Sequence, residues 1–218
     1  MRAVDKGTHP MHDTGELVQL RPYQEATSHL KQRLGRYCSF CERSVPVSLA
    51  VEHKLPKHHF PDLECVWDNF LLGCANCNSI KGTAFIADGV VMFPDTHDTF
   101  SAFEYVESGR IRLRPGLPSQ AAAEAAALLN LVGLSREPKE LSETDHRWDD
   151  RLETWSLAIQ SREDLASEDT PAMRAAILRT AVSRGGFSIW MVAFAHDPEM
   201  RQALARAFPG TRALDIAA

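Results

Sequence analysis

The spacing of hydrophobic and polar residues changes twice along the chain and predicts a protein of the α+β class. Residues 1–20 are mostly polar and contain glycine and proline, so we expect them to form an extended arm. Residues 23–35 then place Ala26, Leu30 and Leu34 at helical spacing. This pattern predicts a short helix that Gly35 ends.

Short apolar runs in the next part of the chain predict β-strands. We expect one strand over residues 48–53 and a second over residues 69–72, followed by a helix over residues 75–87. Residues 103–107 and 110–114 alternate between apolar and polar on either side of a Ser-Gly pair. That alternation predicts a β-hairpin.

Helical spacing dominates from residue 117 to the end. The expected helices cover residues 119–132, 138–166, 170–183, 187–195 and 197–208. The fourth helix is apolar on all sides, so we expect it to be buried, with a docking surface as the alternative. We therefore divide the chain into an arm and helix (1–35), a central core with its hairpin (36–116) and a helical C-terminal domain (117–218).

Composition places the chain among ordinary globular proteins. It has 218 residues, of which 44% are hydrophobic and 24% are charged. No apolar run is long enough for a membrane helix, and the first residues lack the apolar core of a signal peptide, so we expect a cytoplasmic protein. The net charge of −5 is unusual for a DNA-binding protein and hints that a partner supplies part of any DNA affinity.

Four cysteines in two Cys-x-x-Cys pairs predict a structural zinc site. The pairs are Cys38 with Cys41, and Cys74 with Cys77. Structural zinc is tetrahedral, and two such pairs supply four sulfur ligands. The alternatives are disulfides, which are rare in the cytoplasm, or thiols without a role. Cys65 lies outside the pairs, and we expect it to be an inert small hydrophobe.

The stretch between and after the cysteine pairs resembles the HNH endonuclease family. The residues that carry the resemblance are Glu52-His53, Asn69 and Asn78, and Asn78 stands where the family name implies a histidine. The resemblance implies a ββα-metal fold, here stapled by zinc, in front of a mainly helical C-terminal region. It also implies hydrolysis of DNA phosphodiester bonds with Mg²⁺ or Mn²⁺, although the sequence does not distinguish DNA from RNA.

The resemblance also implies a role for each of these residues. Glu52 and Asn78 would supply oxygen ligands to the catalytic metal, since Mg²⁺ prefers hard oxygen ligands and keeps several waters. His53 would accept a proton from the attacking water, because its imidazole titrates near neutral pH. Asn69 would hold the loop between the two strands.

Several basic residues are candidates for contacts with the phosphates of a substrate. Lys81 follows Asn78 at one-turn spacing on the expected helix, and Lys57 follows the Glu-His pair. Arg110 and Arg112 share one face of the expected hairpin, where a solvated strand face is the alternative. His58 and His59 lie in the intervening loop, and we favour solvated side chains there over ligands.

Within the family, the chain most resembles the PtuB-type HNH nucleases of bacterial Septu and retron anti-phage defence systems. The shared pattern is Tyr37-Cys38-x-x-Cys41-Glu42, Val51-Glu52-His53-x-x-Pro56-Lys57, Trp67-Asp68-Asn69 and Cys74-x-x-Cys77-Asn78-x-x-Lys81-Gly82. This resemblance implies a nuclease effector that acts with a PtuA-like ATPase partner. The chain itself has no Gly-x-x-x-x-Gly-Lys-Ser/Thr phosphate-binding loop. Two alternatives remain, a standalone restriction or housekeeping HNH nuclease and a non-catalytic zinc-stapled nucleic-acid-binding module.

Overall fold

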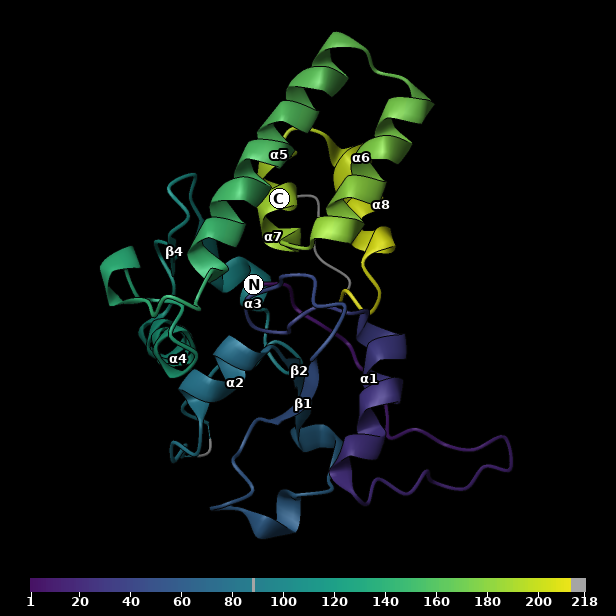
Figure 1. Cartoon of the computed structure of the whole chain (residues 1–218), viewed down its shortest axis with the longest axis vertical. Helices are drawn as coiled ribbons and strands as arrows, with labels where there is room; N and C mark the ends of the chain where they lie inside the picture. Colours follow the sequence, from purple (N-terminus) through teal and green to yellow (C-terminus); the bar gives the residue numbers. More distant parts are fainter. Residues whose placement is uncertain (88, 213–218) are drawn as a thin grey trace.

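The computed structural model describes residues 1–87 and 89–212 and has the α+β class expected from the sequence. The described residues form eight α-helices and two sheets of two antiparallel strands each. The helices α5 to α8 gather at one end of the molecule, and the first sheet lies at the other end with α1 and α2 beside it (Figure 1). The last residues of the expected C-terminal region, 213–218, lie outside the described part of the chain.

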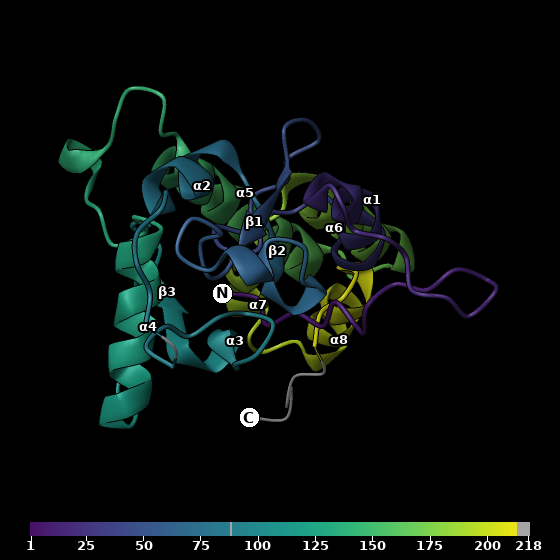
Figure 2. The same ribbon diagram turned by 90° about the horizontal axis from the view of Figure 1, so that it is seen from below.

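The first sheet and the helix that follows it form a compact ββα unit. Strand β1 (Ala50–His53) pairs antiparallel with β2 (Phe70–Gly73), so that His53 lies opposite Phe70 at the end of the sheet. Seen from below, the sheet lies between α1 and α2 (Figure 2). Every residue of β2 is buried, which explains why this strand reads as a continuous apolar run.

Helix α2 (Ala75–Lys81) is shorter than the sequence pattern predicts, and the expectation of a helix over residues 75–87 is wrong beyond Lys81. Gly82 ends the helix with a positive φ of 51°, a conformation that glycine adopts without strain, and its N–H still bonds to the carbonyl of Asn78. The described residues beyond Gly82 leave the helix axis as an irregular loop.

Helix α1 (Ala26–Leu34) confirms the helix expected before the first cysteine pair. It buries Ala26, Leu30 and Leu34 against both strands of the first sheet and ends at Gly35. The expected N-terminal arm is only partly an arm. Residues 1–4 are buried in the core, whereas residues 11–17 form an exposed turn.

The second sheet is the expected hairpin, shorter at both ends. Strand β3 (Phe103–Tyr105) pairs antiparallel with β4 (Ile111–Leu113). A short helix α3 (Thr99–Ala102) leads into it, and α4 (Ser119–Leu131) follows it and packs against α3 and β4. The hairpin buries Phe103, Tyr105 and Ile111.

Four helices make up the remainder of the described chain. They are α5 (Arg147–Ser167), α6 (Pro171–Arg184), α7 (Phe187–Ala193) and α8 (Pro198–Ala207). The expectation of one helix over residues 138–166 is wrong at its start, because a turn in which the N–H of Asp145 bonds to Ser142 precedes α5. Trp190, Met191 and Phe194 are buried, so the expectation that they belong to the core is confirmed.

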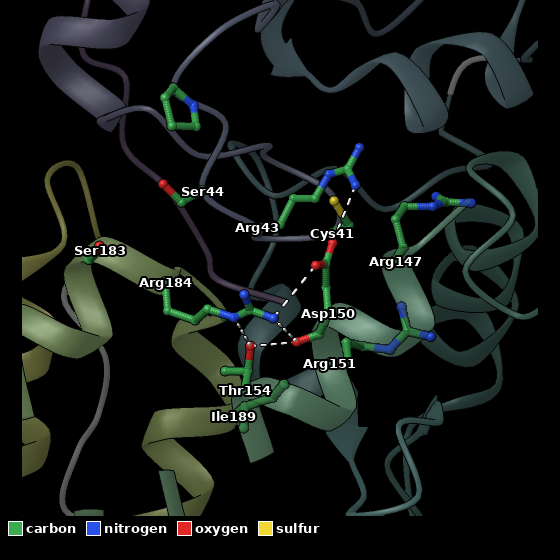
Figure 3. Close-up of a pocket in the computed structure, with 12 residues that line it drawn as sticks. Cys41, Arg43, Ser44, Arg147, Asp150, Arg151, Thr154, Ser183, Arg184 and Ile189 are labelled. Atoms are coloured by element: carbon green, nitrogen blue, oxygen red, sulfur yellow. Dashed lines mark hydrogen bonds and ion pairs between the residues drawn. The ribbon is translucent and has the colours of Figure 1, made fainter. Parts of the chain in front are cut away.

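The segment that carries Cys38 and Cys41 is packed against the helical region. The backbone N–H of Gly186 bonds to the carbonyl of Glu42, and a Cβ atom on Gly185 would lie 2.5 Å from that same carbonyl oxygen. Arg43 reaches Asp150 on α5, and Asp150 in turn pairs with Arg184 at the end of α6 (Figure 3). One cluster of buried hydrophobic residues runs through all three of the expected regions. Among the described residues, no helix combines the length and apolarity needed to cross a bilayer.

Candidate functional site

The four paired cysteines meet in one buried cluster. Cys38 and Cys41 lie on the turn before β1, Cys74 caps the N-terminus of α2, and Cys77 lies on that helix. Their sulfur atoms all lie within 4.8 Å of one another, and none forms a disulfide. The Sγ atoms of Cys41 and Cys74 are 3.7 Å apart. Tetrahedral zinc with Zn–S bonds of about 2.3 Å requires sulfurs roughly 3.8 Å apart, so the cluster can hold a metal ion such as zinc.

Donors from the protein point at three of these sulfurs. The backbone N–H of Cys74 lies 3.4 Å from Sγ of Cys38, and that of Cys77 lies 3.5 Å from Sγ of Cys74. Burial raises the pKa of the Cys41 and Cys77 thiols, whereas hydrogen bonds from Cys38 and the other two cysteines lower that of Cys74. Four thiolates in so small a buried volume need a cation to offset their charge, and a metal ion such as zinc would supply it.

Arg147 at the start of α5 supplies a charged donor to the cluster from a distant part of the chain. Its Nη1 lies 3.2 Å from Sγ of Cys77 and 2.7 Å from the carbonyl oxygen of Val132. Both carboxylate oxygens of Asp145 accept hydrogen bonds from the same guanidinium. Nε donates to Oδ1 and Nη2 donates to Oδ2, each at 2.7 Å. Both side chains are buried, and the positive charge beside Cys77 stabilises thiolate character there.

A cleft of about 450 Å³ opens on the other side of α2. The end of β1 contributes Glu52 and His53, and α2 contributes Asn78 and Lys81. Lys57 lines the same cleft from the loop between the strands. The fold therefore brings together five of the residues that the sequence singles out, and it does so because β1 and α2 are neighbours in the ββα unit.

His53 is held in one orientation. Its Nε2 lies 2.9 Å from the carbonyl oxygen of Glu64, which can only accept, so Nε2 carries the proton and Nδ1 does not. The rings of Tyr23 and Phe70 contact the imidazole edge-on, with centroids 4.7 and 5.2 Å away. Burial lowers the pKa of His53, with the positive charges of Lys57 and Lys81 acting in the same direction.

Glu52 and Lys81 form a buried ion pair. Nζ of Lys81 lies 2.8 Å from Oε1 of Glu52, and both side chains are almost fully enclosed. Burial raises the pKa of Glu52, and the charge of Lys81 opposes that rise. Within the described residues, no hydrogen bond engages Oε2 of Glu52 or the side-chain amide of Asn78. These oxygens are thus free to bind a ligand in the cleft, whereas the Lys81 ammonium group already has a partner.

Asn69 does not line the cleft and instead holds the loop between β1 and β2. The Oδ1 atom accepts the N–H of Leu55 at 2.8 Å, and Nδ2 donates to the carbonyls of Leu55 at 2.9 Å and Leu63 at 3.3 Å. These three bonds pin both ends of the loop that carries Lys57. Asn69 therefore has the loop-holding geometry that the sequence resemblance implies.

The remaining basic candidates occupy two different settings. Lys57 is partly exposed at the cleft and pairs with Glu64 at 2.9 Å. Arg110 pairs with Glu137 at 2.7 Å and Arg112 with Glu104 at 2.6 Å, on the hairpin and outside the residues that line the cleft. The structure therefore does not bring the two hairpin arginines together with Glu52 and His53.

Three groups that contact the functional residues of these sites could not be recognised from the sequence. The Glu64 carbonyl orients His53, the Tyr23 ring contacts it, and Arg147 donates to the cysteine cluster. A backbone carbonyl has no residue-type signature, and Tyr23 and Arg147 lie in predicted helical segments where such residues are ordinary.

No protein-family model matches the sequence, and none of the curated proteins matches it either. The side chains of the cleft and of the cysteine cluster therefore carry the functional interpretation.

Proposed function

We propose that the protein is a metal-dependent endonuclease of the HNH type that hydrolyses DNA phosphodiester bonds. One observation carries the proposal. A single cleft is lined by His53, which has one imidazole nitrogen without a proton, and by Glu52 and Asn78, which offer unengaged carboxylate and amide oxygens. A general base beside oxygen ligands for a hard cation is the combination that metal-assisted hydrolysis of a phosphodiester requires.

His53 is the proton acceptor in this proposal. Because Nε2 donates to the Glu64 carbonyl, Nδ1 keeps a free lone pair that can take a proton from an attacking water molecule. The edge-on rings of Tyr23 and Phe70 restrain the imidazole, so the lone pair keeps its direction. Glu64 thus acts as a positioning residue through its backbone.

The oxygen atoms of the cleft fit a divalent metal ion. Oε2 of Glu52 and the amide oxygen of Asn78 are hard ligands, and Mg²⁺ or Mn²⁺ bound by two protein ligands keeps sites for water and a phosphate oxygen. A cation held there would neutralise charge on the phosphate and on the leaving oxygen. Lys81 pairs with the Glu52 carboxylate through Oε1, and Oε2 has no hydrogen-bond partner among the described residues.

The proposal extends to the biological role that the sequence resemblance implies. We infer that the nuclease serves in anti-phage defence with a PtuA-like ATPase partner. The net charge of −5 supports the need for a partner, because an acidic protein gains little general attraction to DNA. Co-expression with an ATPase encoded beside this gene, followed by affinity purification, tests the proposed partnership. The partnership is contradicted if the ATPase neither co-purifies with the protein nor changes its cutting of DNA.

A non-catalytic, zinc-stapled nucleic-acid-binding module is the second candidate, and one observation favours it. The Lys81 ammonium group already neutralises the Glu52 carboxylate, which reduces the electrostatic gain from a second cation in the cleft. This candidate predicts nucleic-acid binding without cutting under any metal condition.

Plasmid cleavage tests the proposal. Purified wild-type protein and His53→Ala are incubated with supercoiled DNA in Mg²⁺, Mn²⁺ or EDTA, with and without the neighbouring ATPase. We expect metal-dependent nicking by the wild type and its loss in His53→Ala, because the change removes the Nδ1 atom that accepts the proton in this proposal. His12→Ala on the exposed N-terminal turn is the matched control and retains activity. Cutting that survives His53→Ala contradicts the role of this residue, and a wild type inactive in every condition supports the binding module.

A further inference from the structure

A cluster of aromatic side chains borders the cleft, and neither the zinc site nor the proposed reaction uses it. It consists of His58, His59 and Phe60 from one loop and Phe85 from the loop after α2. We call these four residues the aromatic lip. Phe60 and Phe85 stack with an interplanar angle of 19° and centroids 5.9 Å apart. The His59 ring meets Phe85 edge-on at 5.5 Å, and the His58 ring meets His59 at 4.8 Å.

The aromatic lip is continuous with the wall of the cleft. His58 itself lines the cleft, as does Thr83, which lies two residues before Phe85. A hydrogen bond of 2.9 Å from Nε2 of His59 to the carbonyl of Thr83 ties the two loops together. The rings are therefore held in a defined arrangement beside Glu52 and His53.

The Phe85 ring is largely exposed to solvent although it contacts Phe60 and His59. Its exposed fraction is 68%, the second highest among the large hydrophobic residues that the structure describes as exposed. An isolated exposed hydrophobic residue needs no explanation, but Phe85 stacks on Phe60 at the edge of a polar cleft and still exposes a large part of its π-surface. Such a surface suits a planar ligand.

The charges around the cleft point to the kind of nucleic acid that would use this surface. Lys57 and Lys81 are the lysines that line the cleft, and each pairs with a carboxylate, on Glu64 and Glu52 respectively. The site therefore offers few unpaired cations to contact the phosphates of a duplex. Contacts of that kind account for most non-specific binding of duplex DNA. Affinity has to come from another source, and exposed aromatic rings supply one.

We propose that the aromatic lip is a stacking platform for unpaired bases and that the cleft acts on single-stranded or locally unpaired nucleic acid. The inference rests on the proposed nuclease function and specifies its substrate class. In a duplex, the faces of the bases are covered by their neighbours, whereas an unpaired base exposes a π-face that can stack on Phe85. Stacking tolerates any base, so the platform selects for strand state and not for sequence.

Binding is measured first and does not depend on cutting. Fluorescence anisotropy compares a labelled single-stranded oligonucleotide with the same sequence as a blunt duplex, using His53→Ala as the parent protein. We expect the single strand to bind about ten-fold more tightly, in line with one or two stacked bases. Phe85→Leu in this parent abolishes the preference, and Phe85→Trp keeps it, because tryptophan preserves the π-face and leucine preserves only the apolar surface.

Leu157→Ala is the matched control for loss of exposed apolar surface, since Leu157 is exposed on α5 and belongs to neither site. We expect this control to keep the ten-fold preference. The affinity for the single strand should also fall only weakly with salt, because few phosphates are neutralised. A preference that survives Phe85→Leu, or a parent that binds both strands equally, overturns the proposal.

Cleavage by the otherwise unaltered protein separates this inference from the proposed function. With metal and, where needed, the ATPase, we expect a duplex with a central unpaired bubble to be cut faster than a fully paired duplex, and Phe85→Leu to remove the difference. Equal cutting of both substrates supports the proposed nuclease function but contradicts the stacking platform. If no substrate is cut but single strands still bind in a Phe85-dependent manner, the proposed nuclease function is contradicted and the stacking platform is supported. A Phe85→Leu change that weakens only binding to the ATPase assigns the lip to a protein partner and overturns the proposal.

Discussion

The cysteine cluster and the cleft lie on opposite sides of one short helix and differ in how completely their polar atoms are satisfied. Helix α2 supplies Cys77 to the cluster, and Asn78 and Lys81 to the cleft. In the cluster, all four sulfurs face one another, and backbone N–H groups and Arg147 complete their surroundings. In the cleft, the Nδ1 of His53 and the side-chain oxygen of Asn78 have no hydrogen-bond partner within the described residues.

This difference shows which of the two sites stabilises the fold and which is available for chemistry. A closed, four-ligand site leaves no position for a substrate, so a metal bound there would contribute to folding. An open site with unengaged acceptors can bind a substrate, although it contributes less to stability. Because both sites share α2, the cluster fixes the helix that positions Asn78, and loss of the cluster should destroy the cleft as well. The reverse need not hold.

The largest effect is expected from removing one sulfur ligand. Cys77→Ser should lose the metal and unfold the ββα unit, because metal binding in such sites contributes about 10 kcal/mol or more to folding. Elemental analysis for zinc and a circular dichroism melting curve measure both effects. Cys65→Ser is the matched control, since Cys65 lies outside the cluster, and should change neither. A folded Cys77→Ser protein, or a wild type that contains no metal, would show that the cluster is not a zinc site.

The next largest effect is expected at the charged partner of the cluster. Arg147→Met should destabilise the protein by about 3–5 kcal/mol, because it leaves the Asp145 carboxylate buried without its partner. It should also release zinc to a chelator faster, since Cys77 loses a charged donor. Denaturant unfolding and chelator competition measure the two effects separately.

A double variant tests whether the cost arises from the orphaned carboxylate. Arg147→Met combined with Asp145→Leu should recover most of the stability, because no charge is then buried alone. It should not restore slow zinc release, which depends on the donor to Cys77. Full recovery of both properties would mean that Arg147 holds the fold and has no influence on the metal.

The two sites were not equally open to prediction from sequence. The cysteine spacing predicts the cluster because two-residue gaps fix the direction of both sulfurs locally, and Glu52 and His53 follow from a pattern confined to one strand. Arg147 was missed because its contact with Cys77 joins residues far apart in the chain. The start of α5 was misplaced because helical spacing continues through the turn at Ser142 and Asp145, where side-chain and backbone hydrogen bonds compete with the helix.

The N-terminal segment shows another limit of sequence patterns. Its polar character predicted an extended arm, yet Arg2 and Lys6 are buried by specific partners. Arg2 donates to the carbonyls of Leu34 and Pro209, at 2.9 and 3.0 Å, and Lys6 pairs with Asp95 at 2.7 Å. A polar side chain that is buried through tertiary contacts has the same sequence pattern as one in solvent, so periodicity cannot separate the two cases.

A smaller and more selective effect is expected from Lys81→Met in the cleft. It removes the partner of Glu52 and should destabilise the metal-free protein by about 3 kcal/mol, because a carboxylate then lies buried and unpaired. Mn²⁺ should restore part of this loss by taking over the charge of Glu52. Melting temperatures with and without Mn²⁺ are the measurement, and the metal-induced rise should be larger in Lys81→Met than in the wild type. If Mn²⁺ shifts neither protein, Glu52 is not a metal ligand and the binding-module candidate gains support.

The smallest effect is expected at the hairpin, where Arg112→Ala is compared with Lys57→Ala. Lys57 lines the cleft, so its loss should weaken substrate binding and cutting several-fold, mainly through a phosphate contact. Arg112 pairs with Glu104 outside the cleft, and its loss should leave both binding and cutting unchanged within error. Single-turnover cleavage and oligonucleotide binding are measured side by side for the two variants. If Arg112→Ala costs as much as Lys57→Ala, the nucleic acid extends from the cleft across the hairpin, and the two arginines belong to the binding surface that the sequence pattern predicted.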